Sequence, residues 1–375
     1  MNLSTSKGEK MNFIVVFGGV SYEHEISIVS AIALKKELNI AHFVFIDAEN
    51  NLYLIPQDLM TSKHFSTGAY KKDAQASFTK GGFLRKGLFK SEILKGIVIN
   101  LIHGKSGEDG QIAGLLEFYN IAYIGPRIEA CAISFSKELT KSYAQNRGVK
   151  VLDYRVARRE SSANLANLER ESNESNAKDS QKSSTDSSAF PCIIKPSHLG
   201  SSIGIAVAKK KDDLEYALDS AFEFDSVAII EPFIPHIREF NVAGFKANGA
   251  FHFSIIEEVK KDEFFAFEDK YLDFQGSGAK KKAADLSEEM TAKIQENFIK
   301  IYENCFEGAL IRCDFFMLND EIYLNEINPI PGSMAYYLFG DFGDAIRTLT
   351  GDLPRAQKIP IKYQYISKIQ ARKGK

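Results

Sequence analysis

Residues 310–332 restrict the fold of this chain more than any other segment. They combine two apolar, strand-like runs with four strongly polar side chains: Arg312, Asp314, Glu326 and Asn328. The runs are joined by a short turn at 319–321 and predict an antiparallel β-hairpin. Side chains alternate between the faces of a strand, so a three-residue turn pairs 314 with 326 and gathers all four polar groups on one face. A two-residue turn instead shifts the register by one residue and separates the two sets.

This polar face has two interpretations. Oxygen ligands of this kind suit Mg²⁺, which takes one or two carboxylates and completes its coordination with water and phosphate oxygens. A solvated outer face of an antiparallel hairpin explains the same pattern, because water-facing strands also carry acids. The hairpin alone does not decide between the two.

Composition excludes several classes of protein. The formal net charge of −2 gives no indication of nucleic-acid or membrane partners, and no apolar run approaches the ~18 residues that span a bilayer. The polar leader 1–11 lacks an apolar signal core, and Met11 is an alternative start. Four cysteines without metal-type spacing indicate reduced side chains in a cytoplasmic protein.

Residues 12–136 predict an N-terminal α/β domain. The apolar run 12–17 ends in Gly18-Gly19, a helix is expected over about 26–38, and further strands are expected at 42–47 and 96–104. Strands that alternate with helices favour a parallel sheet covered on both faces, with functional loops at the carboxyl ends of the strands.

Two more units and a tail are expected. Residues 137–230 form a central domain interrupted at 158–188, where a Ser-, Asn- and charge-rich insertion has too few apolar residues to dock and is predicted to be disordered. Residues 231–350 contain a hairpin with Asn248-Gly249 at its turn, an amphipathic helix capped by Ser287, and the polar hairpin. Residues 351–375 lack periodicity and predict a loose tail.

Three polar loops are candidates for chemistry. In 195–209, Lys195 ends a strand before a loop of glycines and serines whose N–H groups can approach phosphate; a flexible hairpin with a surface lysine is the alternative. Glu23 follows the glycine turn, whereas the neighbouring Glu25 is explained by the helix dipole. His103 and Glu108 lie at the same expected sheet edge as Glu23. Together with the carboxylate hairpin, these loops favour a nucleotide site beside a small polar substrate site.

These segments together resemble the D-alanine–D-alanine ligases of the ATP-grasp superfamily. The resemblance covers about 12–350 outside the insertion and rests on GGVSYEHEIS, HGKSGEDG, KPSHLGSSIG, EDKY, and RCD with NEINPIPG. It implies an α/β, three-domain ATP-grasp architecture, with ATP held between the central and C-terminal domains. It also implies that two D-alanines and ATP give D-alanyl-D-alanine for peptidoglycan, and it is compatible with a homodimer.

The resemblance implies roles for the nucleotide and metal residues. Asp314, Glu326 and Asn328 would bind two Mg²⁺, for which Mn²⁺ can substitute, with Glu326 bridging. Lys137 and Lys195 would contact the nucleotide phosphates, and Lys270 the γ-phosphate. The adenine and ribose would be held by four further residues: Glu231, Phe233, Ile234 and Glu239.

It also implies roles for residues around the two D-alanines. Glu23 would hold the first ammonium with His103 nearby, and Ser201 would order its loop and reach toward Glu23 and Tyr271. Arg312 and the Gly332 N–H would stabilise the oxyanion. Tyr337 and Leu338 would lie at the second carboxylate, where Lys270 also contributes. Because depsipeptide-forming relatives have His at the position of Tyr271, we expect dipeptide rather than D-alanyl-D-lactate.

Four departures from the family pattern, and three alternatives, accompany these expectations. Tyr337 replaces the usual Ser, His198-Leu199 replaces Arg-Glu, Ser136 replaces Asp, and the turn between Asp314 and Glu326 is one residue shorter. Another ATP-grasp ligase would differ at Glu23, Tyr271 and Tyr337. The complete metal trio disfavours a non-catalytic nucleotide sensor, and the missing G-x-G-x-x-G pattern disfavours a dehydrogenase.

Overall fold

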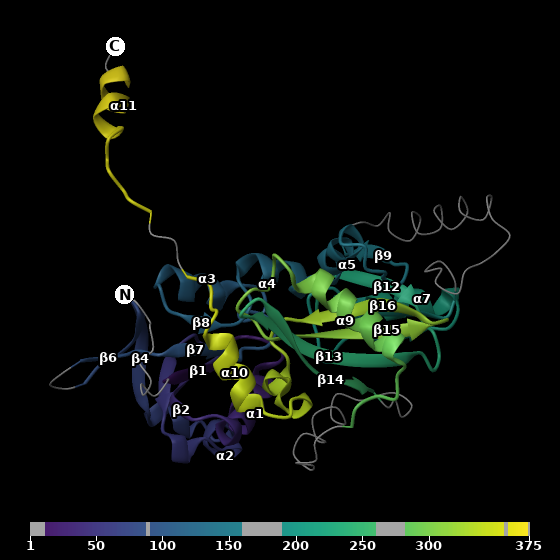
Figure 1. Ribbon diagram of the computed structural model, residues 1–375, viewed down its shortest axis with the longest axis horizontal. Helices are drawn as coiled ribbons and strands as arrows, with labels where there is room; N and C mark the ends of the chain where they lie inside the picture. The colour runs from purple at the N-terminus through teal and green to yellow at the C-terminus, as the bar shows by residue number, and fades with distance from the viewer. Residues whose placement is uncertain (1–11, 88–90, 160–189, 260–281, 356–358, 374–375) are drawn as a thin grey trace.

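The computed structural model describes residues 12–87, 91–159, 190–259, 282–355 and 359–373. The leader 1–11, nearly all of the expected insertion at 158–188, and both Lys270 and Tyr271 lie outside the described residues. The described residues form three β-sheets (Figure 1), of eight, four and four strands.

The first sheet has the strand order β6-β5-β4-β3-β2-β1-β7-β8. Its central strand β1 pairs in parallel with β2 and β7, as the alternation of strands and helices predicted. The parallel sheet expected from these strands is confirmed for β2, β1, β7 and β8, whereas from β2 to β6 every neighbouring pair is antiparallel, so the sheet as a whole is mixed. Three of the four connections there are too short for the crossover that parallel strands require, and only Lys80 and Gly81 separate β4 from β5. The connection from β3 to β4 is longer and contains α2. The strands are β1 Phe13–Gly18, β2 Ile40–Ile46, β3 Leu52–Ile55, β4 Ala74–Thr79, β5 Gly82–Arg85, β6 Glu92–Leu94, β7 Ile97–Asn100 and β8 Tyr123–Ile124.

Helices cover both faces of this sheet. Alternate side chains of β1 point to opposite faces, so Val15 packs in the cluster that contains residues of α1, and Val16 in the cluster that contains residues of α3. The helices of this unit are α1 His24–Glu37, α2 Ser62–Ser66, α3 Gln111–Phe118 and α4 Ile128–Phe135, with short 3₁₀ turns at η1 Gln57–Leu59 and η2 Ala69–Lys72.

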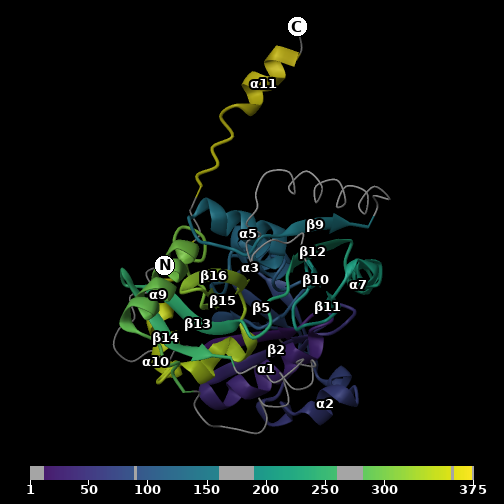
Figure 2. The ribbon, with the colours of Figure 1, turned by 90° about the vertical axis from the view of Figure 1, so that its right-hand side faces the viewer.

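The second sheet is antiparallel, with the order β11-β10-β12-β9. Its strands are β9 Arg155–Arg158, β10 Cys192–Pro196, β11 Ala206–Ala208 and β12 Val227–Pro232. Helix α7 (Leu214–Phe222), preceded by η3 (Lys211–Asp213), packs on it through Leu214, Leu218 and Ala221 (Figure 2). Helix α5 (Lys137–Asn146) is capped by Ser136, whose Oγ accepts a hydrogen bond from the Leu139 N–H.

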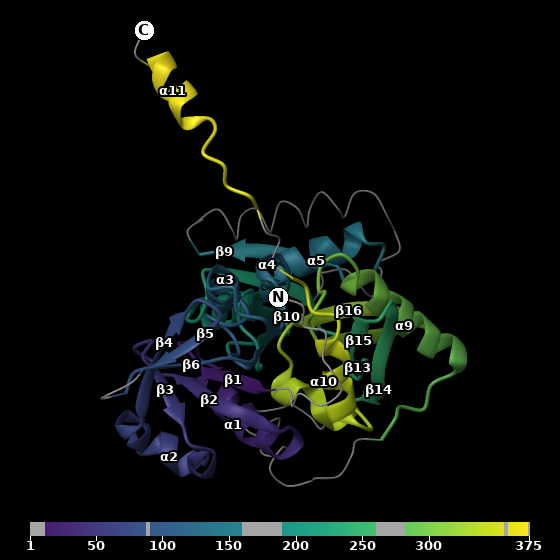
Figure 3. The same ribbon diagram turned by 60° about the vertical axis from the view of Figure 1, so that its left-hand side comes forward.

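The third sheet is also antiparallel and has the order β14-β13-β15-β16 (Figure 3). Its strands are β13 Arg238–Ala247, β14 Ala250–Glu258, β15 Ile311–Leu318 and β16 Glu321–Asn328. The predicted Asn248-Gly249 turn between β13 and β14 is confirmed, and both residues have positive φ. Helix α9 (Glu288–Tyr302) buries Ile294, Phe298 and Ile301, and its predicted cap is confirmed, since Ser287 Oγ accepts from the Met290 N–H at 3.2 Å.

The first and third sheets share one hydrophobic core. Residues of β1 and α1 belong to the same buried cluster as residues of β13, β15 and α9. At the junction, α1 packs against the turn η4 (Gly332–Leu338), which leads to α10 (Phe342–Thr350). This contact joins the N-terminal part of the chain to the segment that follows the polar hairpin.

The C-terminal segment differs from the predicted loose tail. Residues 366–373 form helix α11, which projects away from the rest of the protein with exposed side chains (Figure 1). No helix among the described residues has the length and apolar character needed to cross a membrane.

Candidate active site

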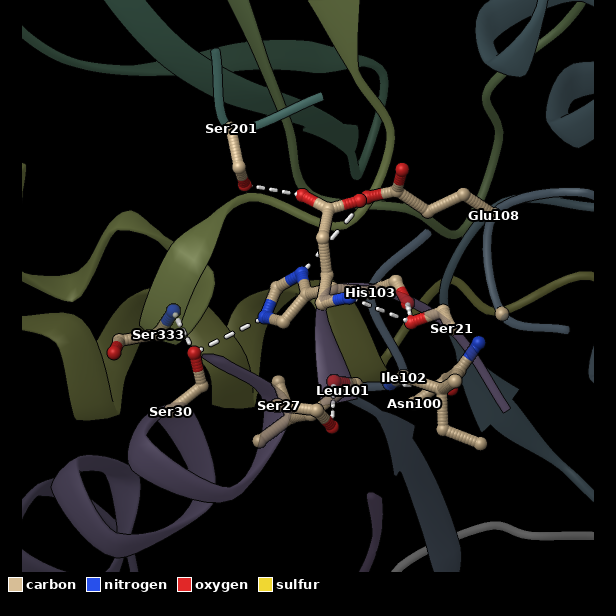
Figure 4. A network of polar contacts seen from close by, with 12 residues as sticks. Ser21, Ser27, Ser30, Asn100, Leu101, Ile102, His103, Glu108, Ser201 and Ser333 are labelled. Atoms are coloured by element: carbon tan, nitrogen blue, oxygen red, sulfur yellow. Dashed lines mark hydrogen bonds and ion pairs between the residues drawn. The ribbon is translucent and has the colours of Figure 1, made fainter. Parts of the chain in front are cut away.

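Three loops from two sheets meet at Glu23, which is buried and lies just before α1. Ser201, in the loop between β10 and β11, donates its hydroxyl to Glu23 Oε1 (Figure 4). On the other side is Gly104, which has φ +68; a Cβ there would lie only 2.6 Å from Glu23 Oε2. Glycine is therefore required at 104 both by its conformation and by the closeness of the carboxylate. The sequence prediction that Glu23 and Ser201 lie together is confirmed.

His103 lies beside this carboxylate and is buried. Its Nδ1 is 3.8 Å from Glu108 Oε1, and its Nε2 is 3.0 Å from Ser30 Oγ. Burial raises the pKa of Glu108, and the contact with His103 opposes that rise. The three residues His103, Glu108 and Glu23 thus converge at the sheet edge where the sequence placed them.

Ser30 is a member of this network that the sequence analysis did not identify. Its hydroxyl accepts a hydrogen bond from the Ser333 N–H at 3.0 Å and contacts His103 from the other side (Figure 4). A signal was present, because Ser27 and Ser30 are three residues apart on the buried face of α1. Polar residues on the apolar face of a helix require buried partners.

The polar hairpin gathers its four side chains on one face, as the three-residue register predicted. Asp314 lies opposite Glu326, and Arg312 opposite Asn328. The turn itself has two residues, Asn319 and Asp320, since Leu318 pairs with Glu321. A β-bulge at Asn325 supplies the extra residue that restores the pairing. The expectation that this pairing needs a three-residue turn was therefore wrong, while the predicted pairing of Asp314 with Glu326 is confirmed.

The Asp314 carboxylate is the most constrained group of this face. Arg312 donates to both of its oxygens, at 2.7 and 2.8 Å, and Asn328 Nδ2 donates to Oδ2 at 3.0 Å. Burial raises the pKa of Asp314 to about 6, although Arg312 opposes that rise. Among the described residues no three His, Cys, Asp or Glu side chains are grouped as a metal site. The two carboxylates and one amide of Asp314, Glu326 and Asn328 are nevertheless an oxygen donor set of the kind that Mg²⁺ accepts.

Buried lysines surround Glu231 next to this hairpin. Glu231 Oε2 lies 2.7 Å from Lys195 Nζ, and Glu231 Oε1 pairs with Lys141 on α5. Burial by itself would raise the pKa of Glu231, but the two ammonium groups hold it at about 2. Lys195 also reaches the bulged residue, Asn325 Oδ1, at 3.4 Å. The sequence analysis missed Lys141, which lies one helical turn after Lys137 on α5.

A small cavity borders the Glu231 cluster. Its lining includes Lys195, Glu231, Phe233, Ile234, Ile237 and Phe316, which brings together most of the residues expected to hold a nucleotide. Glu239 is on β13 opposite Phe316. Lys137 is the first residue of α5, and its Nζ donates to the Leu199 carbonyl of the β10–β11 loop at 2.6 Å.

The end of the hairpin leads to the remaining expected residues. The Tyr337 hydroxyl accepts from Arg312 Nη1 at 3.3 Å, whereas the Leu338 side chain is buried in the shared core. An added Cβ at Gly332 would meet no atom within 4 Å, so the backbone there borders open space. His198, one of the departures from the family pattern, pairs with Asp225 through its Nδ1 at 2.9 Å.

Comparisons with known proteins agree over most of the chain. Family models described as D-ala D-ala ligase N-terminus and D-ala D-ala ligase C-terminus match residues 12–126 and 161–344. A D-alanine–D-alanine ligase from Wolinella succinogenes is 51% identical over 367 residues, covering 97% of this chain and 100% of the relative. One from Campylobacter jejuni subsp. doylei is 50% identical with the same coverage. The crystal structure of the Helicobacter pylori D-alanine–D-alanine ligase aligns with a TM-score of 0.76 and 44% identity, covering 93% of this chain and all of that one.

Proposed function

Because the chain belongs to the D-alanine–D-alanine ligase family, it is an ATP-dependent ligase that forms D-alanyl-D-alanine for peptidoglycan synthesis, and we propose how its residues divide this work. The α/β, ATP-grasp fold expected from sequence is confirmed by the similarity to the Helicobacter pylori structure. The observation that carries the proposal is the single face of β15 and β16 on which Arg312, Asp314, Glu326 and Asn328 lie together.

We assign the metal role to Asp314, Glu326 and Asn328. Their carboxylate and amide oxygens would hold two Mg²⁺, and Mn²⁺ would suit the same donors. When bound, the metal ions would offset the negative charge on the transferred phosphoryl group. Arg312 keeps Asp314 ionised and fixes its orientation through two hydrogen bonds.

We assign the nucleotide to the cavity beside Glu231. Phe233, Ile234 and Phe316 give it apolar walls, and Glu239 on the neighbouring strand would hold the ribose. Lys195 and Lys137 would contact the phosphates, together with Lys270, which lies outside the described residues. Since the Glu231 carboxylate already binds two lysines, we infer that adenine is held mainly by backbone atoms of 231–234.

The first D-alanine would bind at Glu23. This buried carboxylate has Ser201 on one side and would receive the substrate ammonium on the other, with His103 nearby. A carboxylate accepts an amine only after one of its oxygens has become a leaving group. The carboxyl group of this D-alanine is therefore phosphorylated by ATP, and the resulting acyl phosphate must be protected from water.

The second D-alanine would bind between Arg312 and the turn η4. Its amine loses a proton and attacks the acyl carbonyl, and collapse of the tetrahedral intermediate expels phosphate. Arg312 and the Gly332 N–H would stabilise the oxyanion, a type of contribution worth ~3–4 kcal/mol per donor. Tyr337 and Leu338 would lie at the second carboxylate, and Ser201 would reach toward Tyr271, which lies outside the described residues.

We further propose that the chain is organised as three domains, 12–136, 137–230 and 231–350, with catalysis where they meet, and that it acts in the cytoplasm. The separate sheet in each range supports this division. All four cysteines are free, which is consistent with a reducing compartment.

ADP release measured with D-alanine, D-lactate, D-serine and L-alanine tests the substrate assignment, with the products identified by mass. We expect D-alanyl-D-alanine from D-alanine, and little D-alanyl-D-lactate when D-lactate is added to D-alanine. Absence of dipeptide in the presence of ATP, Mg²⁺ and D-alanine would contradict the proposed function. A preference for another acid or amine would favour a different ATP-grasp ligase.

A further inference from the structure

Ser30 forms hydrogen bonds with one residue beside each of the two proposed D-alanine subsites. It lies on α1 with 2% of its surface exposed, and it contacts His103 on the first-substrate side and Ser333 on the turn η4. His103 and Ser333 come from segments far apart in the sequence, yet one hydroxyl joins them (Figure 4). We propose that Ser30 is a positioning residue that holds η4 in the conformation needed for capture of the second D-alanine.

The hydrogen bond between Ser30 and η4 has a defined direction. The Ser333 N–H can only donate, so Ser30 Oγ accepts from it. Among the described residues, His103 Nε2 is the only other hydrogen-bond partner of this hydroxyl, and which of the two donates depends on the tautomer of His103. With either tautomer, one hydroxyl ties the position of the His103 ring to that of the Ser333 peptide.

The turn η4 requires such a restraint. Ser333, Met334 and Ala335 have φ values of 50, 54 and 51°, a left-handed conformation that is unfavourable for three consecutive residues with side chains. Two hydrogen bonds anchor its start: Met334 N–H to the Pro331 carbonyl at 2.7 Å, and Ser333 N–H to Ser30. Because the Gly332–Ser333 peptide is planar, holding the Ser333 N–H also fixes the carbonyl and Cα of Gly332. The Gly332 nitrogen, whose N–H is assigned to the oxyanion, is bonded directly to that Cα.

This inference rests on the proposed function, since it assumes that Gly332 and Tyr337 serve the second step. Loss of the Ser30 hydroxyl frees the turn but leaves the Glu23–Ser201 contact and the metal ligands in place. Phosphorylation of the first D-alanine should then continue while attack by the second slows. The acyl phosphate would instead be attacked by water, giving D-alanine and phosphate without dipeptide.

The test is Ser30→Ala, with Ser27→Ala as a matched control. Ser27 is also a buried serine of α1 with two hydrogen bonds, from the Gly18 N–H at 2.8 Å and to the Leu101 carbonyl at 2.6 Å, but neither reaches η4. For Ser30→Ala we expect dipeptide formation to fall about tenfold or more, the KM of the second D-alanine to rise about tenfold, and ADP release to exceed one per dipeptide. Ser27→Ala should still release one ADP per dipeptide, even if the protein is less stable. Ser30→Thr, which retains a hydroxyl, should restore the ratio toward one.

Two results would overturn the inference. One is a Ser30→Ala protein whose ratio of ADP to dipeptide and whose KM for the second D-alanine equal those of the wild type. The other is a Ser27→Ala protein that releases as much excess ADP per dipeptide as Ser30→Ala. If Ser30→Ala does not fold, Ser30→Cys takes its place, and its weaker thiol should give the same change in smaller amount. A wild-type protein that forms no dipeptide contradicts the proposed function. If the wild type and the Ser30 variant both release one ADP per dipeptide, the Ser30 inference is contradicted and the proposed function is not.

Discussion

The Arg312 guanidinium donates two hydrogen bonds to the Asp314 carboxylate on the same strand, from Nε to Oδ1 at 2.7 Å and from Nη2 to Oδ2 at 2.8 Å. The two residues are separated by Cys313, so their side chains lie on one face of β15. Although burial lowers the pKa of Arg312, Asp314 raises it well above its usual range, so the cation is permanent. One residue can therefore orient a metal ligand and offer its remaining nitrogen to a developing oxyanion.

Arg312→Lys should lower kcat by about 10²–10³ while the protein stays folded, because an ammonium cannot bind both oxygens of Asp314 and stabilise an oxyanion at once. Steady-state dipeptide formation measures the effect. Arg238→Lys is the matched control: Arg238 makes a similar two-bond contact with Glu258, but the pair is partly exposed. Equal losses in both variants would show that Arg312 acts only through general stability.

Glu326→Gln should abolish turnover without unfolding the protein, since an amide cannot replace the charge that a bridging carboxylate gives to metal ions. Mn²⁺ binding followed by paramagnetic resonance should weaken in parallel. Glu321→Gln, on the same strand in an exposed pair with Lys150, should leave both measurements unchanged. Near-normal ADP release by folded Glu326→Gln would refute the metal assignment.

The polar hairpin illustrates how far the sequence could predict the site. Alternation along the strands correctly identified which side chains share a face, because that rule depends on covalent geometry alone. The two-residue turn by itself would have paired Asp314 with Asn325. The bulge that restores the pairing of Asp314 with Glu326 cannot be recognised in the hydrophobic pattern of the sequence. The bulged Asn325 is contacted by Lys195, which is distant in sequence.

The misses elsewhere share one cause. The antiparallel strands between 52 and 94 are short, and most of their pairings follow from connection lengths rather than from periodicity. Ser30 and Lys141 each sit on a helix and act through partners more than 70 residues away. Their signal was a polar residue on a buried helical face, which indicates that a partner exists but does not identify it.

Lys141→Met should lower the free energy of unfolding at pH 7 by about 3 kcal/mol, because it removes one of two cations from a buried carboxylate. Since the folded-state pKa of Glu231 lies below the unfolded value of ~4.3, its contribution is complete above that value and is lost as pH falls toward about 2. With only Lys195 left, the folded-state pKa should be less depressed, so the pH-dependent loss should be smaller and should end at a higher pH. Urea denaturation between pH 3 and 7 measures both effects.

Lys150→Met is the control for this prediction, since it removes an exposed pair with Glu321 that solvent screens. It should change the stability little at any pH in that range. A Lys141→Met protein as stable as Lys150→Met would mean that Lys195 alone is sufficient to neutralise Glu231.

Tyr337→Phe tests how the second carboxylate is bound. The phenol lies 3.3 Å from Arg312 Nη1, where relatives usually have Ser, and burial raises its pKa although Arg312 opposes that rise. The phenol is therefore a neutral donor, and its removal should raise the KM of the second D-alanine several-fold, equally from pH 6 to 9. The KM of the first D-alanine should stay the same. Tyr336→Phe, which changes the neighbouring ring, is the matched control and should alter neither constant. If both KM values of Tyr337→Phe equal those of the wild type, the carboxylate must be held by the backbone at Leu338 and by Lys270 instead.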